Sequence, residues 1–134
     1  MHKKGFSILE VMVVLVILSA LSILAITLFT GNVRQGRRAD GVNTLLAMSL
    51  AEERYRTINT TYGTLAQVWN GVTTSTQGYY TLGISSTSAT GYSLTATAIG
   101  DQANDQSGST SCGTLTLTAS SGTVTEAPAA CWPQ

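Results

Sequence analysis

The sequence predicts an α+β protein in which one long N-terminal helix packs on a small antiparallel β-sheet. Three observations carry this prediction. Residues 11–29 are uncharged and mostly apolar, the chain then continues to residue 58 with apolar side chains at helical spacing, and beyond residue 77 the period changes to two. We therefore expect four segments: a leader at 1–5, a membrane-length helix at 6–31, the amphipathic half of the same helix at 32–58, and a β-sheet head at 59–134.

The leader is too short and too polar to fold. In a secretory signal peptide the apolar core precedes the cleavage site and is lost with the signal. Here the candidate junction, Gly5-Phe6, precedes the apolar core. Cleavage at this junction would leave the membrane helix on the mature chain, and it would remove His2, Lys3 and Lys4, which are the only histidine and the only lysines of the sequence.

The apolar stretch from Val11 to Phe29 holds 19 residues without a charge. At helical rise it spans about 28 Å, close to the hydrocarbon thickness of a bilayer. Lysines precede the stretch, whereas Arg34, Arg37 and Arg38 follow it. The positive-inside rule therefore leaves the topology open.

Glu10 stands at the edge of this stretch and has two interpretations. A carboxylate in the first turn of a helix is stabilised by the helix dipole, by about 0.3 to 1 kcal/mol. An ionisable side chain followed directly by a membrane-length apolar run is costly in lipid unless it is paired, and such a residue marks a functional site. Local physics does not choose between the two.

The next part of the helix is expected to face the head with one side. The apolar or small residues at helical spacing are Ala39, Val42, Leu45, Leu46, Leu50, Ala51 and Tyr55, and the residues expected outside that face are Arg37, Asn43, Thr44, Glu52, Glu53 and Arg56. Gly31, Gly36 and Gly41 each weaken a helix by nearly 1 kcal/mol relative to Ala, so we expect the helix to bend or melt there.

The head is expected to begin with a loop at 59–77 and to continue as an antiparallel meander with one buried face. Alternating apolar and polar residues predict strands at 79–84, 92–98 and 114–118, with a shorter candidate at 123–125. The segment Asp101–Gln106 links two of these strands. It lacks the residue order of an EF-hand, so we expect a solvated turn rather than a calcium site.

The two cysteines, Cys112 and Cys131, have no metal-ligand spacing. In an exported chain such a pair predicts one disulfide closing a loop of about 20 residues, worth about 3 kcal/mol, with two separate thiols as the alternative.

The remaining composition argues against an enzyme. A mature chain without histidine cannot form a Ser-His-Asp or a Cys-His catalytic set. The sequence also has no phosphate-binding Gly-rich loop. We expect no metal, no cofactor and no catalytic residue, so any ATP-driven step must belong to a partner.

The start of the chain closely resembles the type IV pilins. The matching pattern is a short basic leader ending in Gly (Lys3-Lys4-Gly5), then Phe6, three mostly apolar residues, Glu10 and a long apolar helix. The rest resembles, more weakly, the minor pilins grouped with receptors for DNA uptake sequences. The residues concerned are Arg38-Ala39-Asp40, Glu52-Glu53-Arg54-Tyr55, Gly78-Tyr79-Tyr80-Thr81-Leu82, Gly91 to Ala98, Gly113 to Leu117 and Cys131-Trp132.

The resemblance implies a type IV pilin fold and a sequence of events. A prepilin peptidase would cut between Gly5 and Phe6 at the cytoplasmic side of the inner membrane and N-methylate Phe6. An assembly ATPase and a platform protein would then move the subunit into an extracellular filament used for adhesion, twitching motility or DNA uptake. The resemblance also implies a cytoplasmic N-terminus, a periplasmic head, and a filament-core partner for Glu10: the N-terminal amine of a neighbouring subunit.

One departure from the family concerns the membrane helix, because many pilins carry a proline in its second half. This chain has only Pro128 and Pro133. Any loosening of the helix would therefore depend on Gly31 and Gly36.

Two alternative functions remain beside the structural subunit, minor or major. A pilus-associated DNA receptor needs Lys or Arg on an exposed face, and the chain has neither after Arg56, so we expect no DNA recognition by this subunit alone. A type II secretion pseudopilin shares the N-terminus. The pseudopilins usually carry a calcium site or lack a C-terminal cysteine loop, so Cys112 and Cys131 favour a pilus.

Overall fold

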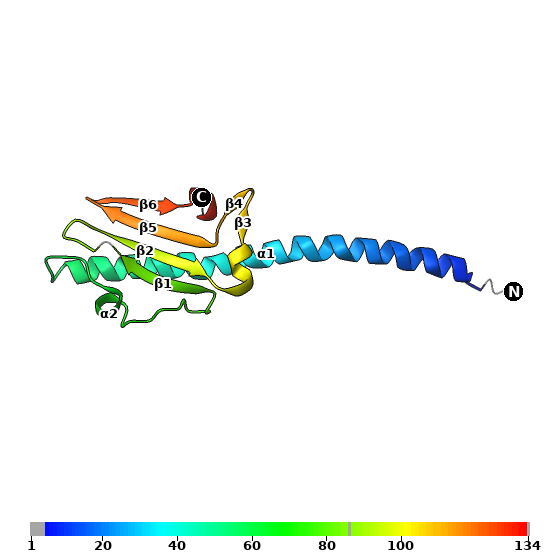
Figure 1. The fold of residues 1–134 in the computed structure, drawn as a ribbon, viewed down its shortest axis with the longest axis horizontal. Coiled ribbons are helices and arrows are strands. Elements are labelled where there is room, and N and C mark those ends of the chain that lie inside the picture. Colours follow the sequence, from blue (N-terminus) through cyan, green and yellow to red (C-terminus); the bar gives the residue numbers. More distant parts are fainter. Residues whose placement is uncertain (1–4, 86, 134) are drawn as a thin grey trace. The chain divides into compact units, whose positions relative to one another are not determined.

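The computed structural model describes residues 5–85 and 87–133, and it confirms the predicted α+β class (Figure 1). One continuous helix, α1, runs from Ile8 to Arg56. The other elements are, in chain order, α2 (Leu65–Val68), β1 (Tyr80–Ser85), β2 (Gly91–Ala98), the 3-10 helix η1 (Gly100–Asn104), β3 (Gln106–Ser107), β4 (Thr110–Ser111), β5 (Thr114–Ser120), β6 (Thr123–Ala127) and the 3-10 helix η2 (Ala129–Cys131).

The chain divides into two compact units, of which the first ends at Val33. Its helix starts directly after Ser7, whose carbonyl accepts the backbone N–H groups of Glu10 at 3.1 Å and Val11 at 3.2 Å. The helix is long and apolar enough to cross a membrane, with a mean hydropathy of 2.9 in its most apolar window. The large apolar side chains described here, from Phe6 to Phe29, are exposed. Such a surface is suited to lipid or to another protein, not to water.

The two serines within the apolar stretch are satisfied inside the helix. The Ser19 hydroxyl donates to the carbonyl of Val16 at 2.8 Å, and the Ser22 hydroxyl donates to the carbonyl of Leu18 at 2.7 Å. These bonds leave no hydroxyl proton to be satisfied by lipid, where an unpaired polar group is costly. The serines are therefore compatible with a membrane-spanning segment.

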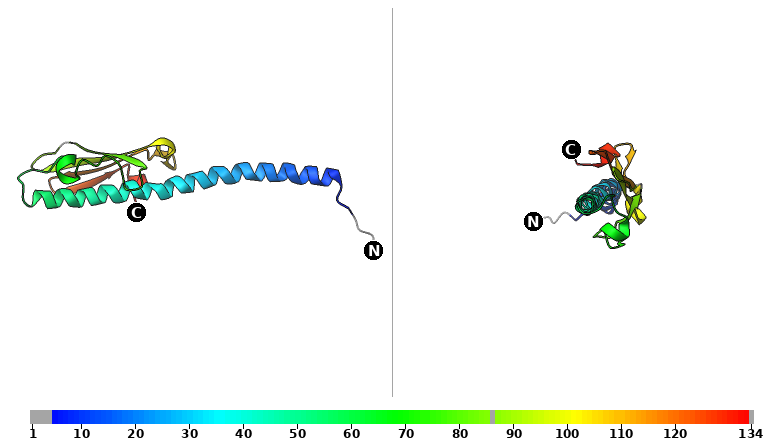
Figure 2. Two further views of the ribbon diagram at one scale, coloured as in Figure 1. Left: turned by 90° about the horizontal axis from the view of Figure 1, so that it is seen from below. Right: turned by 90° about the vertical axis from the view of Figure 1, so that its left-hand side faces the viewer.

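The second unit, from Arg34 onward, contains the sheet and the second half of α1. Four antiparallel strands lie in the order β1-β2-β5-β6, and β3 and β4 form a separate small hairpin. The second half of α1 lies along one face of the larger sheet (Figure 2). All four strands expected from the sequence are confirmed within two residues, whereas the β3–β4 hairpin was not predicted because each of its strands has only two residues.

The core forms where α1 meets the sheet. The buried apolar residues of the strands alternate with outward-facing Thr and Ser, and they pack against three residues of the helix: Val42, Leu45 and Met48. The buried strand residues are Tyr80, Leu82, Tyr92, Leu94, Ala96, Leu115, Leu117 and Ala119.

The predicted head-facing side of the helix was partly wrong. Leu46 and Leu50 were placed on that side, yet they are 46% and 54% exposed. Thr44 and Glu52 were placed outside it, yet both are buried. The physical reason is that the helix buries polar side chains beneath the loops of the head, and the pattern of apolar residues alone does not register this.

The end of α1 also differs slightly from the prediction. The helix was expected to reach Ile58 but ends at Arg56. The backbone N–H of Thr57 is shared between the carbonyls of Glu53 and Arg54, and the Ile58 N–H bonds to Tyr55 three residues earlier, so the last turn tightens. The expected loop at 59–77 contains the short helix α2, which was not predicted.

Gly41 has a packing role that helix propensity did not indicate. A Cβ at this position would lie 3.0 Å from two ring carbons of Tyr80 and 3.1 Å from Leu115. Gly41 therefore permits close contact between α1 and the sheet. Around Gly31 and Gly36 a Cβ would meet nothing within 4 Å, and α1 is helical through all three glycines.

This difference predicts opposite effects for two matched substitutions. Gly41→Ala should lower the free energy of unfolding by about 1–3 kcal/mol, because the added methyl overpacks the contact with Tyr80. Gly36→Ala should raise it by about 0.5–1 kcal/mol, because Ala favours the helix and meets no atom. Urea unfolding of both variants, followed by near-UV circular dichroism, measures the two changes. A stabilised Gly41→Ala variant would contradict the role assigned to Gly41.

Candidate functional site

The Gly5-Phe6 junction lies in an exposed, non-helical stretch just before α1. Residues 5–7 carry no regular structure, and Phe6 is 79% exposed. A Cβ at Gly5 would meet nothing within 4 Å, so packing inside the described chain does not require a glycine there. The junction is accessible to another protein, and any demand for Gly5 must come from outside the chain. Lys3 and Lys4 lie outside the described residues.

Glu10 lies in the first turn of α1, as predicted. Its side chain is exposed among exposed apolar neighbours such as Leu9, Val11 and Met12. The ion pairs found in the described part of the chain are Arg34–Asp101 and Arg38–Asp105, so Glu10 has no cationic partner there. A carboxylate on an apolar helix is costly in lipid unless it is paired with a counter-charge.

The predicted disulfide is present in the second unit. Cys112 and Cys131 are bonded, with their Cα atoms 5.6 Å apart, and both are buried. The bond encloses β5 and β6 and fastens η2 to the end of β4. It thus holds the C-terminal segment on the head. Gly5, Phe6 and Glu10 lie together in the first unit, apart in sequence from this bond.

Two ion pairs join the second half of α1 to η1 and the residue after it. The guanidinium of Arg34 donates to the carboxylate of Asp101 at 2.6 and 3.0 Å, and that of Arg38 donates to Asp105 at 2.6 and 2.9 Å. The Arg34–Asp101 pair is partly exposed, and Arg34 holds the pKa of Asp101 below its usual value. The Arg38–Asp105 pair is buried.

These pairs correct the expectation for Asp101–Gln106. The segment is not a solvated turn throughout, because Gln102 and Asp105 are 1% exposed. The Gln102 amide donates to the Arg34 carbonyl at 2.9 Å and to the Tyr80 hydroxyl at 3.0 Å. The sequence did carry a signal, which was missed: Arg34 and Arg38 are one helical turn apart, and Asp101 and Asp105 have the same spacing.

Asp40 binds the loop that leads into β1. Its carboxylate accepts hydrogen bonds from the Ser75 hydroxyl and from the backbone N–H groups of Gln77 at 3.1 Å and Tyr79 at 3.4 Å. The Ser75 hydroxyl in turn accepts the N–H of Tyr80 at 3.0 Å. One buried carboxylate thus fixes the course of residues 75–80.

Glu52 binds the loop that follows α1, but less completely. Its Oε2 accepts the backbone N–H of Gly63 at 2.8 Å, whereas its Oε1 has no partner, and the residue is fully buried. Burial raises the pKa of Glu52, the hydrogen bond from Gly63 opposes the rise, and the charge of Glu53 adds to it. The site therefore favours the neutral carboxyl.

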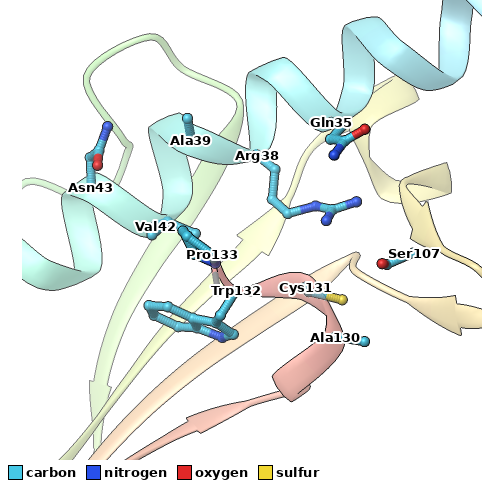
Figure 3. Close-up of a pocket in the computed structure, with 10 residues that line it drawn as sticks. All are labelled: Gln35, Arg38, Ala39, Val42, Asn43, Ser107, Ala130, Cys131, Trp132 and Pro133. Carbon is cyan, nitrogen blue, oxygen red and sulfur yellow. The ribbon is translucent and has the colours of Figure 1, made fainter.

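A hollow of about 350 Å³ lies between α1 and the C-terminal segment (Figure 3). Its polar side includes Arg38, whose guanidinium is already held by Asp105 and by the carbonyl of Gln106 at 3.1 Å. Its apolar side includes Trp132, whose indole N–H donates to the Ala127 carbonyl. The hollow thus offers neither an unpaired guanidinium nor a nucleophile with a base.

The remaining arginines are only partly available to a ligand. The Arg37 guanidinium lies 4.8 Å from the ring centroid of Tyr79, and Arg56 donates to the carbonyls of Asn59 and Ala89. Arg54 is exposed. The second unit carries five arginines against six acidic residues, and the described residues hold no cluster of three metal-ligating side chains.

Two family models match parts of the sequence. Residues 28–116 match the family described as type IV minor pilin ComP, DNA uptake sequence receptor. Residues 1–28 match the prokaryotic N-terminal methylation motif. The search of curated proteins gave no match. Both matched families are structural pilin families and neither is a family of enzymes.

The buried Glu52 generates a pH prediction. Because its pKa is raised in the folded state, its contribution to stability is complete below the unfolded value, about 4.3, and is lost as the pH rises through the folded value. Glu52→Gln should therefore be more stable than the parent at pH 7.5, by about 1 kcal/mol, and the gain should vanish near pH 4. Urea unfolding across this range measures the effect.

Glu126→Gln serves as the control, because Glu126 is exposed on β6 and should change little at either pH. A Glu52→Gln variant that differs from the parent equally at pH 4 and pH 7.5 would show that the carboxyl does not titrate in this interval.

Proposed function

The chain belongs to the type IV minor pilin family of DNA uptake sequence receptors, and we propose that it works by polymerising into a pilus through Glu10. Family membership makes it a structural pilus subunit of the minor class, anchored in the inner membrane by its apolar helix before it joins the pilus. The observation that carries the proposal is the carboxylate of Glu10, which has no cationic partner among the described residues and lies among exposed apolar side chains of the first unit.

Processing comes first in this proposal. A prepilin peptidase cuts between Gly5 and Phe6 and methylates the new amine of Phe6. The match of residues 1–28 to the N-terminal methylation motif supports this, as does the exposure of the junction. Cleavage leaves α1 intact, because the helix begins only at Ile8.

Assembly then supplies the missing counter-charge. The N-terminal amine of Phe6 in one subunit pairs with Glu10 of its neighbour, in an environment made apolar by the helices. A charge pair in low dielectric is strongly destabilising when one partner is absent, by about 3–5 kcal/mol. A subunit in the wrong register would leave both charges unpaired, so the pair selects the register as well as supporting the contact.

The machinery and topology of the proposal follow the family. The N-terminus is cytoplasmic and the head periplasmic, and a separate ATPase and platform protein drive extraction from the bilayer. The Cys112–Cys131 bond fits an oxidising compartment. The pseudopilin alternative receives no support, because Asp101 and Asp105 are bonded to arginines rather than arranged around a cation.

This proposal predicts the behaviour of Glu10→Ala. Leader removal and membrane insertion should be unchanged, whereas incorporation into filaments should fall at least about tenfold, because the amine of the neighbour is left unpaired. Immunoblots of sheared pili against whole cells measure incorporation, and mass spectrometry of the membrane pool measures processing. Ser7→Ala is the matched control on the same turn. Normal incorporation of Glu10→Ala would refute the role of Glu10.

DNA uptake is the second function, favoured by the family match. We propose that this subunit contributes to uptake as part of the filament and that other subunits supply most contacts to phosphates. Two of its arginines are held in ion pairs, and its second unit has more acidic residues than arginines. Phosphate binding depends on available Lys and Arg.

A gel shift tests whether this subunit binds DNA only weakly by itself. Residues 34–134 at low micromolar concentration should retard double-stranded DNA weakly or not at all at roughly 150 mM salt, because few phosphates can be neutralised. Arg54→Gln should remove what binding remains at low salt. Tight retardation that declines steeply with salt would contradict the proposal and would make this subunit a DNA receptor by itself.

A further inference from the structure

A hollow around Trp69 carries an inference beyond pilus assembly. Trp69 follows α2, and with Thr44 and Thr76 it lines two adjoining depressions between α1 and the loop at 70–77. The larger depression has a cavity volume of about 570 Å³. This volume falls within the range of small-molecule sites, about 300–1,000 Å³.

The walls of this hollow are held by hydrogen bonds of their own. Asp40 fixes the backbone at Gln77 from the side of α1. On the other side, the carbonyl of Leu65 accepts the backbone N–H groups of Trp69 at 2.9 Å and Gly71 at 3.0 Å, and Thr74 bridges to Thr81 of β1. The hollow is therefore formed before any ligand arrives, which lowers the cost of binding.

Several polar side chains line the hollow and are open to water. They are the exposed side chains of Asn43, Asn70, Thr76 and Gln77, which make no hydrogen bond to other described residues, and they share the hollow with the partly buried Trp69. The amides and hydroxyl can each donate and accept. They line the same depressions as the ring of Trp69, so a ligand with several hydroxyl groups and an apolar face would exchange hydrogen bonds with them in place of water.

The charged groups that line the hollow favour a neutral ligand over an anionic one. Asp40 is its only ionisable lining residue, and both of its carboxylate oxygens already accept hydrogen bonds from the loop. No lysine or arginine lines either depression. An anionic ligand such as a nucleotide phosphate would find no counter-charge, whereas a neutral ligand needs none.

We propose that this hollow binds a neutral saccharide. The C–H face of a sugar ring packs on the indole of Trp69, whose π-face is electron-rich, while Asn43, Asn70 and Gln77 exchange hydrogen bonds with its hydroxyls. The site makes the subunit a glycan-recognising component of the filament. It depends on the head alone and not on Glu10 or on polymerisation.

The test uses the full chain in dodecylphosphocholine micelles, because this detergent has no sugar group. Neutral mono- and disaccharides (galactose, N-acetylglucosamine, lactose) are titrated, with saturation-transfer NMR and tryptophan fluorescence as readouts, and deoxyadenosine monophosphate forms a separate arm. We expect at least one saccharide to bind with a Kd on the order of 1 mM, typical of a shallow site, and the nucleotide not to bind.

Variants assign the binding to this hollow. Trp69→Ala and Gln77→Ala should each weaken saccharide binding at least about tenfold, a loss equivalent to about 1.4 kcal/mol. Thr97→Ala is the matched control, because Thr97 is exposed on β2 and faces the outer side of the sheet. The near-UV circular dichroism of each variant reports its fold. Should Trp69→Ala unfold, Gln77→Ala and Asn70→Ala carry the test.

Three results would overturn the proposal. The first is the absence of saturation transfer from every saccharide at concentrations well above 1 mM, and the second is equal binding by the parent and by folded Trp69→Ala or Gln77→Ala. The third is preference for the nucleotide, which would assign the hollow to nucleobases instead. Because the micellar chain is unpolymerised, failure of the Glu10 proposal would leave these outcomes unchanged.

Discussion

The buried ion pair between Arg38 and Asp105 is the constraint on which the head depends. Both side chains are almost fully removed from water, and leaving either one without the other would cost about 3–5 kcal/mol. Asp105 follows directly after η1, and the adjacent Arg34–Asp101 pair fastens the beginning of that element. The connection from β2 to β3 can therefore hold only one position along α1.

Two further acidic residues of α1 act on other connections in the same manner. Asp40 holds the loop before β1, and Glu52 holds the loop after the helix. Apolar packing by Val42, Leu45 and Met48 attaches the sheet to α1. Apolar burial is non-directional, so this packing alone would let the helix slide along the sheet. The polar bonds are directional, so they fix the register of helix and loops that the apolar contacts leave loose.

Prediction from the sequence succeeded for the structural features that one kind of residue determines by itself. Period-two alternation located the strands, because a buried strand face admits few polar residues. Within the chain, Cys112 and Cys131 could form a disulfide only with each other, because the sequence has two cysteines. It failed for the head-facing side of α1 and for the segment after β2. Glu52, Asp105 and Gly41 are unfavourable inside a core until a specific backbone N–H, guanidinium or ring is brought to them, and that partner is distant in sequence.

The edges of the sheet are poorly suited to a contact between subunits. The β1 edge is covered by the preceding loop: Leu82 N–H donates to the Thr73 carbonyl at 2.8 Å and Ser75 N–H donates to Tyr80 at 2.9 Å. The opposite edge, β6, is only five residues long and carries a charge at Glu126. Short or charged edges resist strand addition by another chain.

With both edges protected, the exposed surface that most needs a partner is the apolar half of α1. It has no charge between Glu10 and Arg34, and its described large side chains are open along the whole length. In lipid this surface is satisfied at every position alike, so lipid cannot choose a register. In the proposed assembly the carboxylate of Glu10 makes that choice, because Glu10 is the one charged residue between Phe6 and Arg34.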